Sequence, residues 1–200
     1  MKKSAITFAL GMLTLSGTLT TDVRAADVEE GKIAFETCRG CHSIPNYSNV
    51  YPTYYVPKIG GQRAEYIVSA LKAYKEKNRP HGTMKANAYN LSDKTMENIA
   101  KYLETSKNRG SSSPATGDAS IGKKLAEPCV GCHAEGPNAG ANIPRLAGQY
   151  GNYLVKVMKD YQSGKRNNAL MQSMVQDLSD EDLENIAAYF AGMKGLSAVE

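Results

Sequence analysis

Two stretches of this chain carry apolar residues at the spacing of an α-helix. Within residues 63–77 the apolar positions Tyr66, Ala70 and Tyr74 recur every four residues, and residues 150–164 show the same pattern. Such a period predicts an amphipathic helix with one face turned toward a core. No segment alternates between apolar and polar positions as a strand would, so the predicted fold class is all-α. The further helices that we expect are residues 28–38, 93–105, 119–129 and 180–193.

The starts of two of these helices carry capping signals. Ser92 and Ser179 each stand just before a helical segment, where a serine side chain can accept a hydrogen bond from a free backbone N–H. Acidic residues follow each serine in the first turn, as is typical of helix N-termini. The sequence therefore predicts that these helices begin at Asp93 and Asp180.

The helical pattern occurs twice because the chain contains an internal repeat. Residues 57–62 (PKIGGQ) recur as residues 144–149 (PRLAGQ), at an offset of 87. Residues 108–117 (NRGSSSPATG) have the composition of a linker. We therefore expect two tandem domains, at residues 26–107 and 118–200. Pairs matched at the same offset include Tyr66 with Tyr153, Arg79 with Arg166, Met84 with Met171, and Leu91 with Leu178.

Each half also contains one Cys-x-x-Cys-His motif, and the two copies use all four cysteines of the chain. The motif is typical of covalent haem attachment, in which both thiols add to the vinyl groups of one haem and the adjoining histidine ligates the iron. We therefore predict two covalently bound haem c groups. The residues predicted to hold them are Cys38, Cys41, Cys129 and Cys132, beside His42 and His133.

Other uses of paired cysteines fit the sequence less well. A zinc ribbon needs its two Cys-x-x-Cys pairs roughly 15–20 residues apart, whereas these pairs lie 91 positions apart. A thioredoxin-like dithiol belongs to a βαβ unit, and no such alternation surrounds either pair. A disulfide framework would leave the histidine after each pair unexplained. Metal or dithiol chemistry is the alternative to haem attachment.

Residues 1–25 have the pattern of a secretory signal peptide. Lys2 and Lys3 precede a mostly apolar run at residues 4–19, and the small residues around Ala25 offer a cleavage site. The run is short and broken by Thr, Ser and Gly, so an uncleaved anchor that spans ~30 Å of hydrocarbon is the less favoured alternative. Covalent haem attachment outside the cytoplasm agrees with this pattern. We therefore expect a periplasmic mature protein, with cleavage after Ala25.

Removal of this segment changes the charge balance. The whole chain has 24 basic and 20 acidic residues, a net charge of +4. The first 25 residues hold Lys2, Lys3, Arg24 and Asp22, which leaves 21 basic and 19 acidic residues and a net charge of +2. Haem propionates would lower this charge further. The near-neutral balance gives no support for a nucleic-acid partner.

The order of these features resembles a class I cytochrome c in each half. An N-terminal helix ends in Cys-x-x-Cys-His, and a proline-bearing loop, a middle helix, a methionine and a C-terminal helix with an aromatic residue follow. The tandem arrangement, with Pro-x-(Ile/Leu)-x-Gly-Gln in both halves and a methionine before Leu-Ser-Asp, resembles the dihaem cytochrome c4 family over residues 27–195. The resemblance implies two tandem class I cytochrome c domains, each wrapped around a haem.

The resemblance also implies the ligands of each iron. His42 and His133 would be the proximal ligands, and Met84 and Met171 would be the distal ones, in loops after the middle helices. A thioether sulfur is soft and neutral, so it favours Fe(II) and raises the reduction potential relative to a second histidine. Methionine more often packs in a core, but the equivalent repeat positions of these two favour ligation.

Two neighbouring residues compete with the methionines. His81, whose repeat partner is Asn168, stands three residues before the first methionine, and a bis-histidine site would lower that haem's potential. We expect His81 to be a partly exposed loop residue instead. Met174, whose repeat partner is Asn87, competes in the second half, where Met171 is favoured.

Several supporting contacts follow from the resemblance. Pro57 and Pro144 match the loop proline whose carbonyl accepts the Nδ1–H of the proximal histidine. Gly31 resembles the glycine that lets two helices cross closely. Arg79 and Arg166 can pair with haem propionates or lie on the surface. Four tyrosines crowd one loop, which would line a haem edge, the domain interface or its own small core: Tyr47, Tyr51, Tyr54 and Tyr55.

The function that the resemblance implies is electron transfer. With both axial positions filled by side chains, neither iron offers an open site to a substrate, so we expect no catalytic residues and no enzyme activity. The expected partners are redox proteins, namely a quinol-oxidising complex and a terminal oxidase or reductase. We expect a monomer, either free or peripherally bound to the membrane. A haem subunit of a larger dehydrogenase and, less favoured, a dihaem peroxidase are the alternatives.

Overall fold

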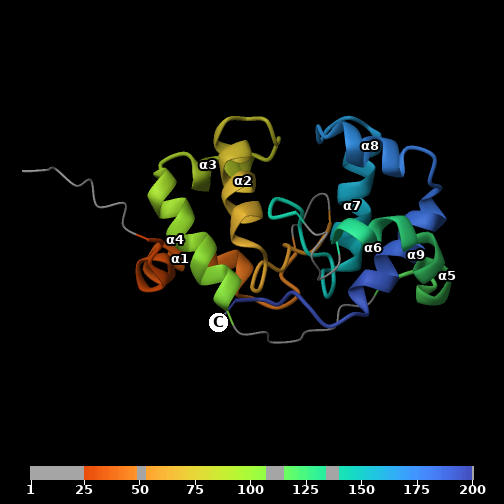
Figure 1. Cartoon of the computed structure of the whole chain (residues 1–200), viewed down its shortest axis with the longest axis horizontal. Coiled ribbons are helices and arrows are strands. Elements are labelled where there is room, and N and C mark those ends of the chain that lie inside the picture. The colour runs from red at the N-terminus through yellow and green to blue at the C-terminus, as the bar shows by residue number, and fades with distance from the viewer. Residues whose placement is uncertain (1–24, 49–52, 107–114, 134–139, 200) are drawn as a thin grey trace, which may run out of the picture.

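Helices joined by loops make up the fold in the part of the chain that the structure describes, and the helices form two groups that lie side by side (Figure 1). Strand-like pairing within those residues is limited to two isolated bridges, Ser48 with Tyr55 and Gly60 with Ser197. The all-α prediction is therefore confirmed. The predicted signal peptide, apart from its last residue, and most of the predicted linker lie outside the described residues. The computed structural model describes residues 25–48, 53–106, 115–133 and 140–199.

The two groups repeat one order of helices, as the internal repeat predicts. Ser92 and Ser179 cap the last helix of each half, because their hydroxyls accept hydrogen bonds from the N–H groups of Thr95 and Asp182. Among the described helices, none has the length and apolarity needed to cross a membrane. The first half comprises α1 (Val28–His42), α2 (Ala64–Lys75), α3 (Gly82–Ala88) and α4 (Asp93–Thr105). The second half comprises α5 (Ala119–Leu125), α6 (Glu127–His133), α7 (Gly151–Gln162), α8 (Ala169–Val175) and α9 (Asp180–Ala191).

The helix that carries the haem motif is continuous in the first half and broken in the second. α1 runs through the whole first motif, whereas α5 ends at Leu125 and α6 begins at Glu127. Pro128 explains the break, because it has no N–H to donate to the carbonyl four residues earlier and it fits the first turn of a new helix. Thr37 occupies the equivalent position of α1. The expectation of one helix over residues 119–129 is wrong for this reason.

The first helix of each half crosses the last one at very close range. A Cβ on Gly31 would overlap with the backbone carbonyl of Asn98, and a Cβ on Gly122 would overlap with that of Asn185. The Asn98 side chain also accepts a hydrogen bond from the Asp27 N–H at 2.9 Å, at the start of α1. The close crossing expected at Gly31 is confirmed, and it recurs in the second half.

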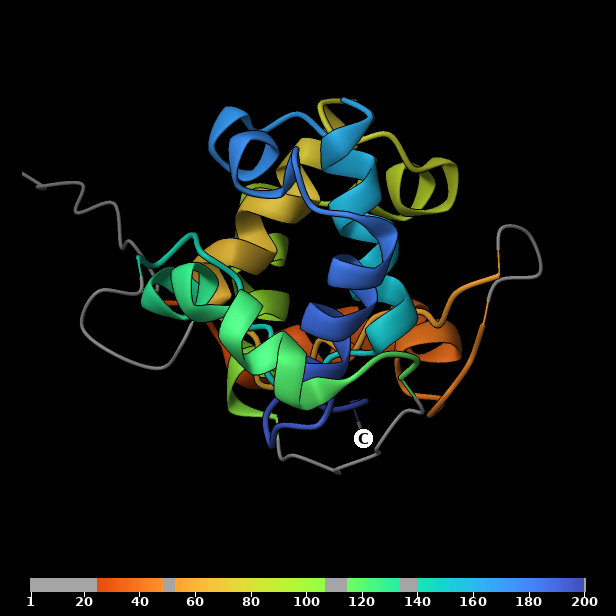
Figure 2. The same cartoon turned by 90° about the vertical axis from the view of Figure 1, so that its right-hand side faces the viewer.

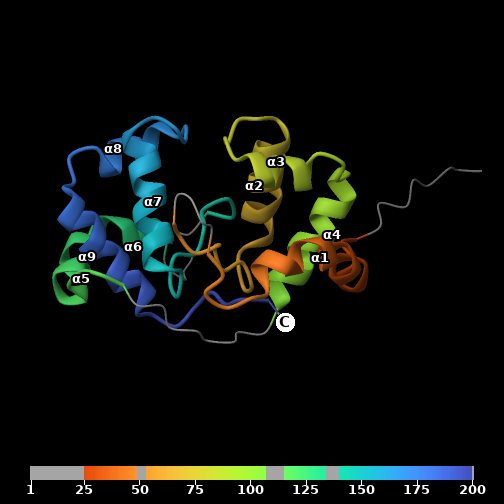
Figure 3. The same ribbon diagram turned by 180° about the vertical axis from the view of Figure 1, so that it is seen from behind.

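Each half has its own buried core, and the end of the chain contributes to the core of the first half. The C-terminal segment, residues 195–199, leaves the second half after α9 and runs along the base of the molecule to the first half (Figures 1 and 3). Val199 joins the first core there, and Cys38 and Cys129 pack at the edges of the first and second cores. The first core holds Phe35, Ile67, Ile99, Ala100 and Leu103, and the second holds Ala126, Leu154, Ile186, Ala187 and Phe190.

Candidate haem sites and the interface between them

The candidate proximal histidine of the first half is fixed by a single hydrogen bond. His42 is the last residue of α1, and its Nδ1 lies 2.9 Å from the carbonyl oxygen of Pro57. A carbonyl only accepts, so Nδ1 carries the proton and Nε2 keeps a free lone pair for a metal. Burial lowers the pKa of His42 below its usual value, even though the Pro57 carbonyl opposes this shift. The ring is therefore neutral near pH 7, as an iron ligand must be.

The second half repeats this arrangement. His133 is the last residue of α6, and its Nδ1 lies 2.8 Å from the carbonyl oxygen of Pro144. Burial again lowers the pKa of the histidine, with the Pro144 carbonyl acting in the opposite direction. The hydrogen bonds that the resemblance implied at Pro57 and Pro144 are thus present in both halves.

The four cysteines are placed as a covalently attached haem requires. Each pair lies at positions i and i+3 of a helix, which puts both sulfurs on one face beside the following histidine. None of the four is paired in a disulfide, and burial raises the pKa of the Cys38 and Cys129 thiols. Cys38 and Cys129 pack against apolar residues, whereas Cys132 is exposed. The donor set, two thiols and one oriented neutral imidazole in each half, fits haem c.

The candidate distal methionines lie in short helices and not in loops, so that expectation is wrong. Met84 is in the first turn of α3 and Met171 is in the first turn of α8. Each turn forms because the residue three positions earlier caps it: the side chains of His81 and Asn168 accept hydrogen bonds from the Met84 and Met171 N–H groups at 3.2 and 3.0 Å. α3 packs on α2 and α8 packs on α7, at the same end of the molecule (Figures 1 and 2).

His81 has a structural role that sequence reasoning missed. Its Nδ1 accepts from the Met84 N–H, and its Nε2 lies 3.1 Å from the hydroxyl of Tyr54. Both ring nitrogens are therefore engaged within the protein. The signal that could have revealed this was Asn168 at the equivalent position, because asparagine is a strongly preferred N-cap residue.

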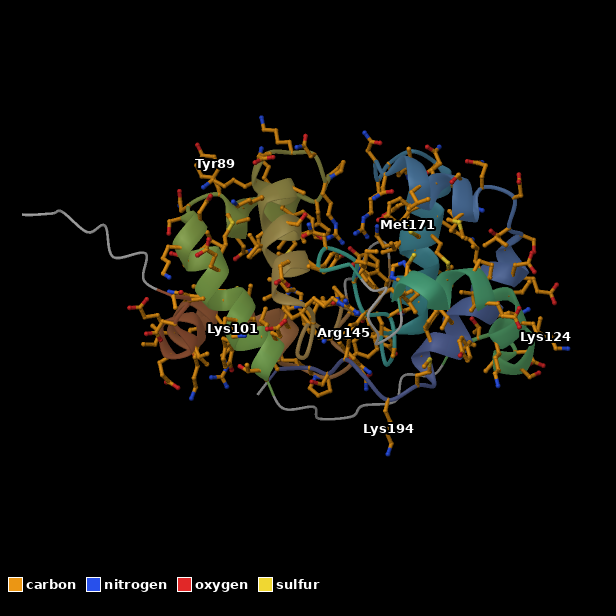
Figure 4. The ribbon with its side chains drawn as sticks, in the orientation of Figure 1. Tyr89, Lys101, Lys124, Arg145, Met171 and Lys194 are labelled. Carbon is orange, nitrogen blue, oxygen red and sulfur yellow. The ribbon has the colours of Figure 1, made fainter. Side chains whose placement is uncertain are left out.

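Burial also separates Met171 from its competitor. The Met174 side chain lies in the same short helix and is 39% exposed, whereas Met171 is half-buried. Figure 4 labels Met171 on the second half beside α7. The structure therefore favours Met171 as the inward-facing methionine of α8.

Four equivalent side chains from the two halves meet at the interface. Arg79 donates to the hydroxyls of Tyr66 and Tyr153 at 3.4 and 3.0 Å, and Arg166 donates to the Tyr66 hydroxyl at 3.0 Å. Neither guanidinium forms an ion pair with a carboxylate of the described residues. Of the two alternatives for these arginines, ordinary surface positions fit less well, since both are half-buried and bond across the interface. Such a cluster is electropositive and suits an anion, either a haem propionate or a phenolate.

The tyrosine at the centre of this cluster has an unusual acidity. Burial on its own would raise the pKa of Tyr66, but the guanidiniums of Arg79 and Arg166 outweigh it and lower the pKa to about 8. Each arginine also stacks on a tyrosine of its own half, Arg79 over Tyr74 at 4.6 Å and Arg166 over Tyr161 at 4.8 Å.

The tyrosine-rich loop of the first half belongs to the same interface. The Asn46 N–H donates to the Tyr150 hydroxyl at 2.9 Å, and the Tyr55 ring lies 5.0 Å from the Tyr150 ring. Tyr55 also donates its backbone N–H to Asn152 of the second half at 3.3 Å. Tyr51 lies outside the described residues. Among the expectations for this loop, the domain interface is the one that fits.

Comparison with known proteins agrees with this geometry. The sequence matches the cytochrome c family over residues 28–107 and 119–194. It is 32% identical over 183 residues to cytochrome c4 of Pseudomonas aeruginosa, covering 84% of this chain and 90% of that protein. It is 28% identical over 183 residues to the thiosulfate dehydrogenase electron acceptor of Stutzerimonas stutzeri, covering 80% of this chain and 79% of that protein.

A solved structure extends the comparison to the fold. The crystal structure of reduced recombinant cytochrome c4 from Pseudomonas stutzeri is similar with a TM-score of 0.67 and 26% sequence identity, over 84% of this chain and all of that chain (100%). The two Cys-x-x-Cys-His motifs are therefore haem c sites with histidine and methionine ligation. The chain belongs to the cytochrome c4 family, as two tandem cytochrome c domains that carry two haems and act as an electron carrier and not as an enzyme.

Proposed function

We propose that this chain is a periplasmic electron carrier that accepts electrons from a quinol-oxidising complex and passes them to a terminal oxidase or reductase. The signal-peptide pattern of residues 1–25 supports export, and the mature protein would then consist of domains at 26–107 and 118–200 joined through the linker 108–117. The similarity to cytochrome c4 along both halves supports the role of a dihaem carrier.

We assign one iron to His42 and Met84 and the other to His133 and Met171. The observation that carries this assignment is the pair of Nδ1 hydrogen bonds to loop carbonyls, 2.9 and 2.8 Å long, which leave both Nε2 atoms free for iron. The two methionines support it, because each lies at an equivalent point of the repeat in a capped turn.

When bound, each haem supplies the reversible one-electron chemistry of its iron. The protein attaches each haem, orients the iron ligands and sets the reduction potential. The cysteines of each motif would hold the porphyrin covalently through thioether bonds, and the loop carbonyls keep the proton of each proximal histidine on Nδ1. The methionine sulfurs favour Fe(II) and raise the potentials. With His42 and Met84 on one iron and His133 and Met171 on the other, neither iron would offer an open site, which favours electron transfer over the chemistry of a peroxidase.

A second candidate donor is a dehydrogenase. The relative named as a thiosulfate dehydrogenase electron acceptor favours it, because that protein matches most of this chain. The site would be the same, and only the partner would differ.

Rapid mixing tests the donor directly. We expect membranes that contain a quinol-oxidising complex to reduce the oxidised holoprotein when quinol is added, and to do so faster than a thiosulfate dehydrogenase supplied with thiosulfate. Faster reduction by the thiosulfate dehydrogenase would make that dehydrogenase, and not the quinol-oxidising complex, the proposed donor. Reduction by neither partner would contradict the respiratory role.

A further inference from the structure

The glutamine that ends each Pro-x-(Ile/Leu)-x-Gly-Gln segment reaches across the interface into the other half. Gln62 donates from Nε2 to the carbonyl of Arg145 at 3.1 Å and accepts from the Arg145 N–H at 2.8 Å. Gln149 does the same at Lys58, donating at 2.8 Å and accepting at 2.9 Å. Both glutamines are buried, with exposed fractions of 3% and 4%. The pair of bonds that Gln62 forms is therefore repeated by Gln149 at the equivalent position of the second half.

The residues that the glutamines hold are the ones that follow the loop prolines. The carbonyl of Pro57 and the N–H of Lys58 belong to one planar peptide group. The carbonyl accepts from His42 Nδ1 at 2.9 Å, and the N–H donates to Gln149 Oε1 at 2.9 Å. A continuous path of hydrogen bonds therefore runs from the proximal histidine of the first half, through one peptide, to a glutamine of the second half.

The mirror path is also complete. His133 Nδ1 lies 2.8 Å from the carbonyl oxygen of Pro144, and the N–H of the same peptide, which belongs to Arg145, donates to Gln62 Oε1 at 2.8 Å. Each haem site is thus connected to the glutamine of the opposite half.

Two basic side chains hold the glutamine loops in place. Lys58 Nζ donates to the Gly148 carbonyl at 2.7 Å, and Arg145 Nη1 donates to the Gly61 carbonyl at 2.6 Å. Gly61 and Gly148 have φ values of 78° and 77°, which favour glycine and turn the chain so that the next side chain crosses the interface. Figure 4 labels Arg145 at this junction between the halves.

We propose that Gln62 and Gln149 are crossed positioning residues, each tuning the haem of the opposite half. This inference rests on the assignment of His42 and His133 as proximal ligands. A glutamine oxygen that accepts from the peptide N–H polarises the peptide and makes its carbonyl a stronger acceptor. The histidine then becomes a better donor to iron, which stabilises Fe(III) and lowers the potential. Loss of the glutamine raises the potential of the haem across the interface.

The test uses the holoprotein with Gln149→Leu and, as its mirror, Gln62→Leu. Leucine has a similar size and cannot form hydrogen bonds. The reduction potential of each haem is measured by titration, with the haem-methyl NMR signals of the two halves followed separately. The hyperfine-shifted Nδ1–H signal of each proximal histidine gives a second readout that a purely structural role of the glutamine would not move.

We expect Q149L to raise the reduction equilibrium constant of the first-half haem about three- to tenfold, which is less than the effect of removing a group that contacts a ligand directly. At ~59 mV per tenfold for one electron, this is an upward shift of about 28–59 mV. The second-half haem keeps its potential. Q62L shows the opposite pattern.

Two further variants keep the test decisive. Tyr150→Phe removes a bond across the interface, to the Asn46 N–H, that lies on neither path, so both potentials stay unchanged. If Q149L fails to fold, Gln149→Met, whose thioether is at most a weak acceptor for the Lys58 N–H, raises the first-half potential in the same direction.

Equal shifts of both reduction potentials in both leucine variants would mean that the glutamines act only through packing at the interface. A shift confined to the haem of the variant's own half would also overturn the proposal. So would unchanged potentials of both haems. Failure of the ligand assignment is distinguishable, because the wild-type protein would then lack methionine ligation at one haem before any substitution.

Discussion

The backbone N–H of Val199 donates a hydrogen bond to the carbonyl oxygen of His42, 3.2 Å away, so the end of the chain is joined to the first haem motif. Ser197 exchanges two backbone hydrogen bonds with Gly60, at 3.0 and 3.1 Å. The Val199 side chain is 2% exposed and packs in the core of the first half. The last residues of the predicted second domain therefore pack against the first half.

Val199→Ala should weaken the first half. The substitution leaves a small cavity in that core, and we expect it to cost about 2 kcal/mol of the free energy of unfolding. Urea unfolding of the holoprotein, followed through the haem signals of each half, measures this. Lys194→Ala is the matched control, since Lys194 is exposed and precedes the C-terminal segment (Figure 4). A loss confined to the second half would contradict the role of Val199.

His81→Ala should loosen the methionine turn of the first half only. The substitution removes the acceptor for the Met84 N–H, a capping contact worth about 1 kcal/mol. We expect the near-infrared methionine–Fe(III) absorption of that haem to weaken. His81→Asn should preserve it, because asparagine caps the same turn at Asn168 in the second half.

An unchanged absorption in His81→Ala would show that α3 needs no cap. If His81→Asn instead removed the haem's low-spin spectrum, His81 would be an iron ligand. Asn168→Ala provides the equivalent change in the second half.

Local patterns predicted the elements that depend on local physics. The apolar period around Tyr66 and Tyr74 predicted α2, and Ser92 predicted the start of α4, because helix periodicity and capping are determined by neighbouring residues. The bounds of α2, α4, α7 and α9 differ from the predicted ones by at most two residues, where helix ends fray, whereas α1 runs four residues past its predicted end at Cys38. The break at Pro128 was also readable from the sequence, because proline has no backbone N–H to donate within a helix.

The contacts between the two halves could not be predicted from the sequence. The Pro-x-(Ile/Leu)-x-Gly-Gln repeat was visible, but nothing local indicates that Gln62 bonds to Arg145 or that Val199 enters the first core. Such partners are distant in sequence and depend on how two domains dock. The loop expectation for Met84 failed for a smaller reason, since histidine is not among the favoured N-cap residues and its capping bond was not anticipated.

Gly31→Ala should be strongly destabilising. A Cβ there overlaps with the backbone of α4 at Asn98, so the helices must separate, and overpacking of this kind costs roughly 1–3 kcal/mol. Lys32→Ala in the same helix is the control, because Lys32 is exposed and lies outside the haem motif. Thermal unfolding of the two holoproteins compares them. Equal stabilities would mean that α1 and α4 can move apart without cost.

Tyr66 should titrate near pH 8, because the two guanidiniums lower its pKa to about 8 from an unfolded value of about 10. The unfolded chain binds more protons between these values, so the contribution of Tyr66 to stability grows as pH rises from 8 to 10 and is lost as pH falls through 8. The phenolate should also lower the haem potentials. Tyrosinate absorption in wild type and Tyr66→Phe measures the midpoint. A midpoint at or above 10 would mean that haem propionates neutralise the arginines instead.

A redox titration of the purified holoprotein tests the central claim most directly. The haem bands and the near-infrared methionine–Fe(III) absorption are followed together. Histidine–methionine ligation by His42 with Met84 and by His133 with Met171 predicts two positive-potential centres and an absorption equal to two methionine-ligated haems. One centre at a much lower potential, without its share of that absorption, would contradict the assignment and with it the paired electron carrier.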